Sequence, residues 1–231
     1  IRPGQRDEAA FKGYTVVNCA TVVVTHLTKL IQDHARELLG RQECLRLVDT
    51  LREDNPKVVE EVLSSEGISF GAVVNVLQIL LEEGVSIRDL LTIFEALADY
   101  CPTVKSPEML VRYVRKYLGR AIVGKYLDEE SFLQVATLDR AVEDMLIAGL
   151  QVNEDGTTAL SIEPDVAQRI LNNTAEIFAK GEVATPILVC GSQIRWDLRR
   201  LYSRFIPGLV VLAFDELPPD VRTQNIGVVT I

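Results

Sequence analysis

The sequence has few of the residues on which most catalytic and metal sites depend. Its 231 residues include only two histidines, His26 and His34, and four cysteines. The two histidines lie in a segment predicted to be one helix, roughly 12 Å apart along its axis, which excludes a shared metal ion. The cysteines never form a Cys-x-x-Cys pair, so the spacing of zinc ligands is missing and reduced thiols are expected. We therefore expect no metal and no cofactor.

Long apolar runs and an excess of basic charge are also missing. No apolar run approaches the ~18 uncharged residues that a helix needs to cross a bilayer. Lys and Arg number 24 against 33 Asp and Glu, a net charge of −9, and this balance argues against nucleic-acid binding, which depends on neutralising phosphates. Because the chain begins at Ile1 rather than Met and no signal peptide precedes it, we expect it to be a piece of a longer protein.

Apolar residues, by contrast, are plentiful, and their spacing divides the chain into three stretches. Residues 1–40 end in an amphipathic helix. Residues 41–128 are predicted to be all helix and to form a compact bundle, because short links join the amphipathic segments. In residues 129–231 strands alternate with helices, which is typical of α/β units. The predicted fold class is α+β: an all-helical bundle subdomain followed by a small α/β subdomain with a mixed sheet.

The first stretch contains a candidate strand and a candidate catalytic pair. The run from Tyr14 to Val17 favours a strand, and Asn18 is expected to cap the helix that follows. His34 lies on the apolar stripe of this helix, so we expect a packed core histidine. Cys19 and His26 lie two turns apart, too far for the hydrogen bond of a Cys–His dyad.

One segment could support an enzyme. Cys190-Gly191-Ser192 follows a predicted buried strand and precedes a helix, and such a turn can bind an anion at the helix N-terminus. It has a single glycine, however, and matches neither the dinucleotide-binding nor the P-loop pattern. A small-molecule-binding α/β enzyme that uses this turn is the alternative function, and we expect no enzyme.

Basic residues cluster on the last helix of the bundle, predicted to run from Pro107 to about Tyr126. Close packing would explain the presence of Gly119 inside this helix. Local basic faces on an acidic chain favour contacts with acidic faces of neighbouring copies, with solvated surface as the alternative and nucleic acid as the least favoured. The residues predicted to form this subunit interface are Arg112, Arg115, Lys116 and Arg120.

Several short sequence segments combine residues in a way that helix and strand formation alone do not require. They include Gly13-Tyr14-Thr15-Val16-Val17, Gly84-Val85-Ser86-Ile87-Arg88-Asp89 and Leu118-Gly119-Arg120-Ala121-Ile122. In this order they resemble the C-terminal cytoplasmic region of the FlhA/SctV family, the large membrane protein of the type III export apparatus in flagella and virulence injectisomes. The third run resembles flagellar members more than injectisome members, whereas Asn18-Cys19 stands where flagellar members often have Asp-Pro.

The resemblance implies an architecture and partners. The family's cytoplasmic region has four subdomains and forms a nine-membered ring below the export gate. Residues 1–40 resemble the tail of the first two subdomains, 41–128 the third and 129–231 the fourth. Export chaperones with their substrates, and components such as the ATPase complex, are the implied partners. Membrane contact at the bacterial inner membrane would be made only by a part that precedes this chain.

The resemblance also implies a docking site. Val16, Val17 and Thr25 stand at positions that resemble the family's chaperone-docking dimple, which lies between the first two subdomains. On the residues alone, both valines could equally be ordinary core and Thr25 plain surface. The other wall of the dimple would come from residues before Ile1.

Overall fold

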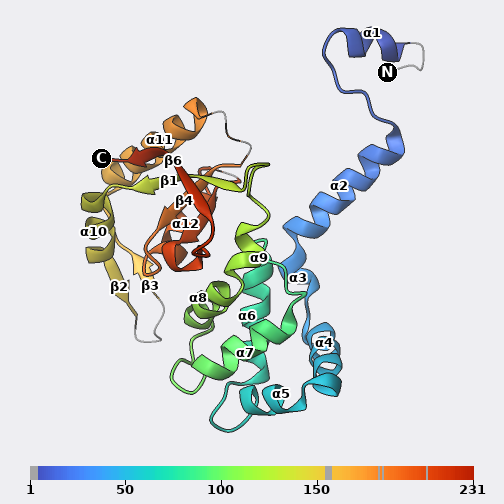
Figure 1. Cartoon of the computed structure of the whole chain (residues 1–231), viewed down its shortest axis with the longest axis vertical. Helices are drawn as coiled ribbons and strands as arrows, with labels where there is room; N and C mark the ends of the chain where they lie inside the picture. Colours follow the sequence, from blue (N-terminus) through green and yellow to red (C-terminus); the bar gives the residue numbers. More distant parts are fainter. Residues whose placement is uncertain (1–4, 154–157, 182, 184, 207) are drawn as a thin grey trace.

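The chain runs from a protruding N-terminal segment through a group of helices into an α/β unit (Figure 1). The computed structural model describes residues 5–153, 158–181, 183, 185–206 and 208–231. Helices fill the chain up to residue 123, and strands alternate with helices from residue 132 onward. The predicted fold class is confirmed.

The N-terminal segment is helical but contains no strand. It forms α1 (Arg6–Phe11), α2 (Cys19–Asp33) and α3 (Ala35–Leu38). The Asn18 side chain caps α2 as predicted, accepting the Thr21 N–H at 2.7 Å. The strand expected from Tyr14 to Val17 is wrong, since these residues are irregular and pair with no strand in the described ranges. A β-favouring run becomes a strand only where a partner lies beside it.

The apolar stripe of α2 is exposed. Val23, Leu27 and Ile31 expose 63%, 54% and 50% of their surfaces, and no residue of α2 is buried. His34, which follows α2, is also exposed, and its Nδ1 lies 3.2 Å from Glu37 Oε1. The expectation of a packed core histidine is therefore wrong for this structure. The reason is that α2 leads away from the body of the molecule, while α3, which follows it, packs against α6 (Figure 1).

The second stretch forms the predicted bundle. Its helices are α4 (Arg41–Asp54), α5 (Pro56–Val62), α6 (Phe70–Glu82), α7 (Leu90–Tyr100), α8 (Pro107–Tyr117) and α9 (Gly119–Val123). Ser69 and Asp89 cap α6 and α7 with their side chains, and Gly84 ends α6 with a φ of +70°, which glycine adopts without strain. The single long helix predicted after Pro107 is wrong, because Leu118 leaves helical geometry and separates α8 from α9.

The third stretch contains two separate sheets. Its elements are β1 (Phe132–Leu138), α10 (Arg140–Ala148), β2 (Leu150–Val152), β3 (Thr158–Leu160), α11 (Pro164–Lys180), β4 (Ile187–Cys190), α12 (Arg195–Ser203), β5 (Val210–Ala213), the 3₁₀ turn η2 (Phe214–Glu216) and β6 (Arg222–Val229). Four strands pair in the order β5-β4-β1-β6, all parallel, while β2 and β3 form an antiparallel pair. Parallel and antiparallel pairing thus occur in different sheets rather than within one mixed sheet.

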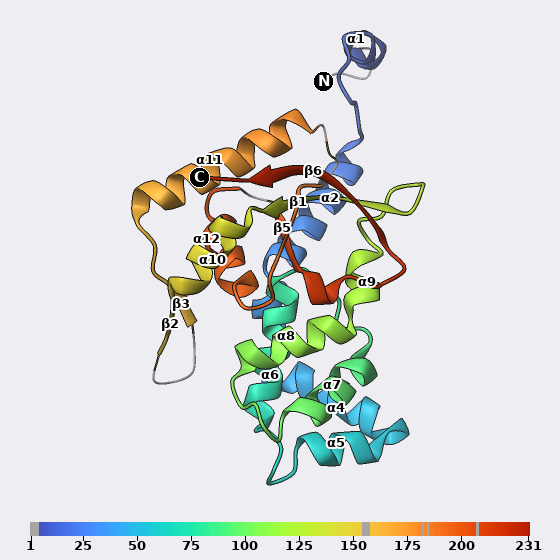
Figure 2. The same cartoon turned by 60° about the vertical axis from the view of Figure 1, so that its left-hand side comes forward.

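The four-stranded sheet connects the two parts of the molecule. One of its faces, with Leu133, Val135 and Ile187, belongs to the same apolar core as the bundle helices. The opposite face, which includes Ala136 and Leu188, packs in a second core with α10, α11 and α12. The sheet is therefore covered on both faces, as parallel sheets require, and the bundle provides one of the two covers (Figure 2).

Candidate functional site

The predicted docking residues lie in the protruding segment. Val16 and Val17 line a groove of about 580 Å³ between α1 and the irregular residues that follow it. Val16 is half-buried, whereas Val17 exposes 50% of its surface. Thr25 is exposed on α2 and does not line this groove. The structure thus brings the two valines together but not Thr25.

The four residues of the predicted basic interface have different environments. Lys116 and Arg120 are exposed, and Arg120 pairs with Asp220 at 3.0 Å. Arg112 is half-buried and donates from Nη2 to Ser192 Oγ at 2.6 Å. Arg115 exposes only 2% of its surface. Its assignment to a subunit interface is therefore wrong, because its guanidinium is enclosed within its own chain.

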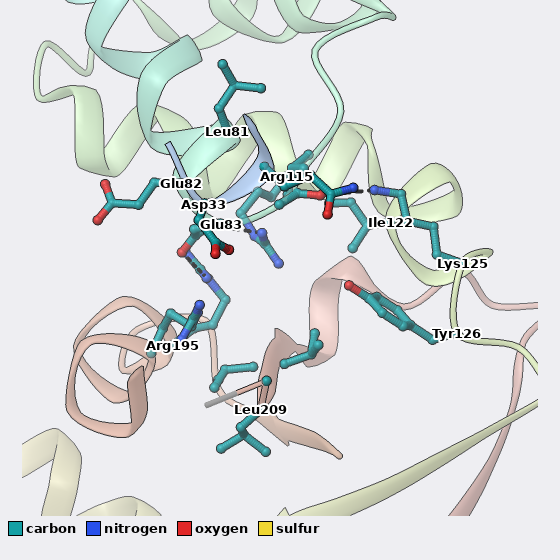
Figure 3. Close-up of a pocket in the computed structure, with 17 residues that line it drawn as sticks. Asp33, Leu81, Glu82, Glu83, Arg115, Ile122, Lys125, Tyr126, Arg195 and Leu209 are labelled. Atoms are coloured by element: carbon teal, nitrogen blue, oxygen red, sulfur yellow. Dashed lines mark hydrogen bonds and ion pairs between the residues drawn. The ribbon is translucent and has the colours of Figure 1, made fainter. Parts of the chain in front are cut away.

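Arg115 belongs to a buried cluster of four charged side chains, here called the charge cluster: Glu83, Arg115, Arg195 and Glu216. Figure 3 labels three of them, Glu83, Arg115 and Arg195. Arg115 binds Glu216 through two parallel hydrogen bonds of 2.8 and 2.6 Å and Glu83 at 2.9 Å. Arg195 donates to Glu83 at 2.7 Å, and its Nε lies 3.4 Å from a Glu216 oxygen. Two cations therefore face two anions.

The charge cluster joins the bundle to the α/β unit. Glu83 and Arg115 come from the ends of α6 and α8, and Arg195 and Glu216 from α12 and η2. Burial alone would raise the pKa of Glu83, but the charges of Arg195 and Arg115 outweigh it and hold this pKa below its ordinary value. Glu83 is consequently ionised at neutral pH, and each side chain of the charge cluster depends on the others to compensate for lost hydration.

The sequence contained a signal for the burial of Arg115. This residue lies four positions after Val111 and three before Leu118, and both of these are buried. It is therefore on the apolar face of its helix, not on the polar one. A charge in such a position needs a buried partner, but the sequence alone does not indicate which acidic residue supplies it.

The Cys190-Gly191-Ser192 turn is occupied by the protein's own side chains. The Gly191 N–H donates to Glu143 Oε1 at 2.6 Å, so this carboxylate takes the place of an anionic ligand. A cavity of only about 30 Å³ lies beside Ser192, whereas ligand sites have about 300 Å³ or more. The Cys190 thiol is fully buried, and burial raises its pKa. The alternative function as an enzyme is therefore not favoured.

The thiols should differ in reactivity accordingly. Cys19 is exposed, while Cys44, Cys101 and Cys190 are buried. Since the thiolate is the reactive form and needs access, we expect one thiol per chain to react rapidly with Ellman's reagent and all four to react in denaturant. Serine substitution of Cys19 should abolish the rapid phase. A rapid phase that persists in this variant and disappears on substitution of Cys190 would restore the case for a nucleophile in the turn.

No cluster of three or more His, Cys, Asp or Glu side chains suited to a metal ion occurs in the ranges that the structure describes. Among the same residues, every helix is too short or too polar to span a bilayer.

Comparison with known proteins identifies the family. The family described as FHIPEP matches residues 1–222. The chain belongs to the FHIPEP family. The flagellar biosynthesis protein FlhA of Bacillus subtilis is 41% identical over 233 aligned residues, which cover 100% of this chain and 34% of that protein. FlhA of Escherichia coli K12 is 37% identical, covering 94% of this chain and 31% of that protein. The chain thus spans about a third of the length of these FHIPEP relatives.

Solved structures share the fold. A nonameric SctV-C structure from EPEC superimposes with a TM-score of 0.85 at 27% identity, covering 99% of this chain and 69% of that one. The Chlamydia pneumoniae CdsV protein gives a TM-score of 0.86 at 24% identity, covering 99% and 65%, which supports the FHIPEP fold alone.

Proposed function

We propose that this chain is part of the cytoplasmic region of a type III protein export apparatus, at the inner membrane of a flagellar system. The observation that carries the proposal is the 41% identity with a flagellar FlhA over the full length of the chain. Seven further relatives, at 31–37% identity, are also named flagellar biosynthesis protein FlhA, which favours the flagellar over the injectisome system. Contact with the membrane would be made by a part of the longer protein outside this chain.

The same proposal includes a ring. Two similar structures, SctV-C and the EscV cytosolic domain, are described as nonameric, each at 27% identity. We propose that this chain contributes to such a ring and that Lys116 and Arg120, which are exposed, face acidic side chains of a neighbouring copy. Opposite charges on one chain suit a head-to-tail interface that closes on itself. Arg115 has no part in this contact, because it is buried.

Docking of chaperone–substrate complexes is the third component. Residues 1–40 would be the tail of preceding subdomains, 41–128 the third subdomain and 129–231 the fourth. The exposed stripe of α2 supports this division, since an apolar helical face of this size ordinarily packs against other residues. Val16, Val17 and Thr25 would then line one wall of a docking surface whose other wall lies in the longer protein. Components such as the ATPase complex would be further partners.

Thr25→Met in the full-length protein tests the docking surface. Thr25 is exposed and contacts no buried residue of its helix, so a longer apolar side chain should fill the surface without disturbing the fold. We expect the dissociation constant for chaperone–substrate complexes to rise by at least about tenfold, with an unchanged melting temperature of the protein.

Thr50→Met serves as the matched control. Thr50 is likewise exposed, but it lies on α4, in a different part of the chain. It should leave binding and melting unchanged. Unchanged binding by the Thr25 variant would remove Thr25 from the docking surface, while equal losses in both variants would point to a general effect of an added methionine.

A further inference from the structure

A pocket of about 520 Å³ lies against the charge cluster, between the bundle and the α/β unit (Figure 3). Its walls come from the end of α2, the end of α6, α8, α9, α12 and β5. It is distinct from the groove at Val16 and Val17 and has no part in the proposed chaperone docking. Its size is within the range of pockets that hold ligands.

The acidic side chains of this pocket are all paired. Glu83 binds the two arginines of the charge cluster. Glu82 pairs with Arg36. Asp33 lies 3.9 Å from Lys29 Nζ. None of the three is left to attract a cation.

The basic and donor groups are not all paired. Arg199 is half-buried in the pocket wall and makes no hydrogen bond or ion pair with any residue that the structure describes. The Tyr126 hydroxyl, also half-buried, has no hydrogen-bond partner within the described ranges, and it points toward the side of the pocket on which Arg115 and Glu83 lie (Figure 3). Lys125 donates only to the Gly84 carbonyl, at 3.1 Å.

The charges of these groups act on one another. Burial raises the pKa of Tyr126, while the positive charges of Arg115 and Arg199 oppose this rise. Arg199 also lowers the pKa of Glu83. Arg199 is thus close enough to influence both walls of the pocket, and its guanidinium forms no ion pair with a carboxylate in the described chain.

Part of the lining is aliphatic. Leu81 and Val210 are half-buried and offer surfaces on which aliphatic groups can pack beside a charged group, whereas the other aliphatic residues of the lining are buried: Val85, Ile122, Leu209 and Val211. A free inorganic anion would leave these surfaces in contact with water. An acidic side chain flanked by apolar residues would cover them and would also neutralise Arg199.

We propose that this pocket binds an acidic peptide segment of a partner protein, in which an Asp or Glu lies between apolar residues. The carboxylate accepts hydrogen bonds from the Arg199 guanidinium and the Tyr126 hydroxyl, and the flanking side chains pack on the aliphatic wall. Hydrogen bonds to charged groups in such partly desolvated sites are stronger than neutral ones, and this favours the carboxylate over a neutral amide.

The test titrates the isotope-labelled 231-residue chain with acetyl-Leu-Glu-Leu-amide and follows backbone amide shifts. We expect saturable shifts around the pocket, and acetyl-Leu-Gln-Leu-amide should bind at least about tenfold more weakly, which corresponds to about 1.4 kcal/mol. Arg199→Gln should weaken binding of the acidic peptide by a similar factor of about ten, and Tyr126→Phe should weaken it by a smaller factor.

Arg204→Gln is the matched control, because Arg204 is exposed at the end of the same helix and lies outside the pocket. It should change affinity by less than about twofold. Shifts that do not saturate, or that Arg199→Gln leaves unchanged, would overturn the proposal. Inorganic phosphate that binds as tightly as the acidic peptide and depends equally on Arg199 would instead identify a site for free anions. Because none of these readouts involves Thr25 or chaperones, their failure is distinguishable from failure of the proposed docking function.

Discussion

Glu216→Gln is expected to lower the free energy of unfolding by about 3–5 kcal/mol, the usual effect of breaking a buried ion pair. Glu216 exposes 2% of its surface and accepts two hydrogen bonds from Arg115. Glutamine keeps one oxygen but places an amide N–H group against a guanidinium, so that one acceptor is lost and one positive charge remains buried without compensation. Urea unfolding followed by circular dichroism measures the change.

Asp220→Asn is the control for this experiment. The Arg120–Asp220 pair also bridges the two parts of the molecule, but its side chains expose 76% and 58% of their surfaces. Water and salt screen such a pair, so the expected loss is below about 1 kcal/mol. If the two variants lost similar stability, burial would not be what gives the charge cluster its importance.

The difference between these two pairs also shows where sequence-based prediction ended. Caps were predictable because they depend on a few neighbouring residues: the Asn18 side chain accepts the backbone N–H of Thr21, in the first turn of the following helix. The partner of Arg115 is Glu216, which is 101 positions away in the chain. No local pattern links the two, so the arginine was assigned to a basic surface when it is in fact part of the junction.

The N-terminal segment shows a second limit. Periodicity identified α2 and its apolar stripe correctly, because the stripe is a property of the helix itself. Whether a stripe is buried depends on which residues pack against it, and Leu27 and Ile31 remain exposed here. The same reasoning explains Tyr14 to Val17, which have strand-forming residues but no strand partner in the described chain. Amphipathicity therefore predicted the helix and which of its faces is apolar, but not whether that face is buried.

The packing of α9 against η2 gives the second large prediction. A Cβ atom at Gly119 would lie 2.2 Å from the Glu216 carbonyl oxygen, well inside van der Waals contact. Both groups are backbone, so neither can turn aside as a long side chain would. We expect Gly119→Ala to destabilise the protein by about 3 kcal/mol, the upper part of the range for an overpacked core, because η2 must move away from α9 and take Glu216 with it.

Gly124→Ala separates this effect from the ordinary difference between glycine and alanine. Gly124 ends α9 in right-handed helical geometry, and its nearest contact to an added Cβ, the Arg120 carbonyl oxygen, is 3.0 Å away within the same turn. Alanine should change stability there by less than about 1 kcal/mol in either direction.

A double variant of Gly119→Ala with Glu216→Gln should lose less stability than the sum of the two single losses, since moving η2 already disrupts the hydrogen bonds between Arg115 and Glu216. Strictly additive losses would mean that the glycine contact and the charge cluster stabilise the junction independently.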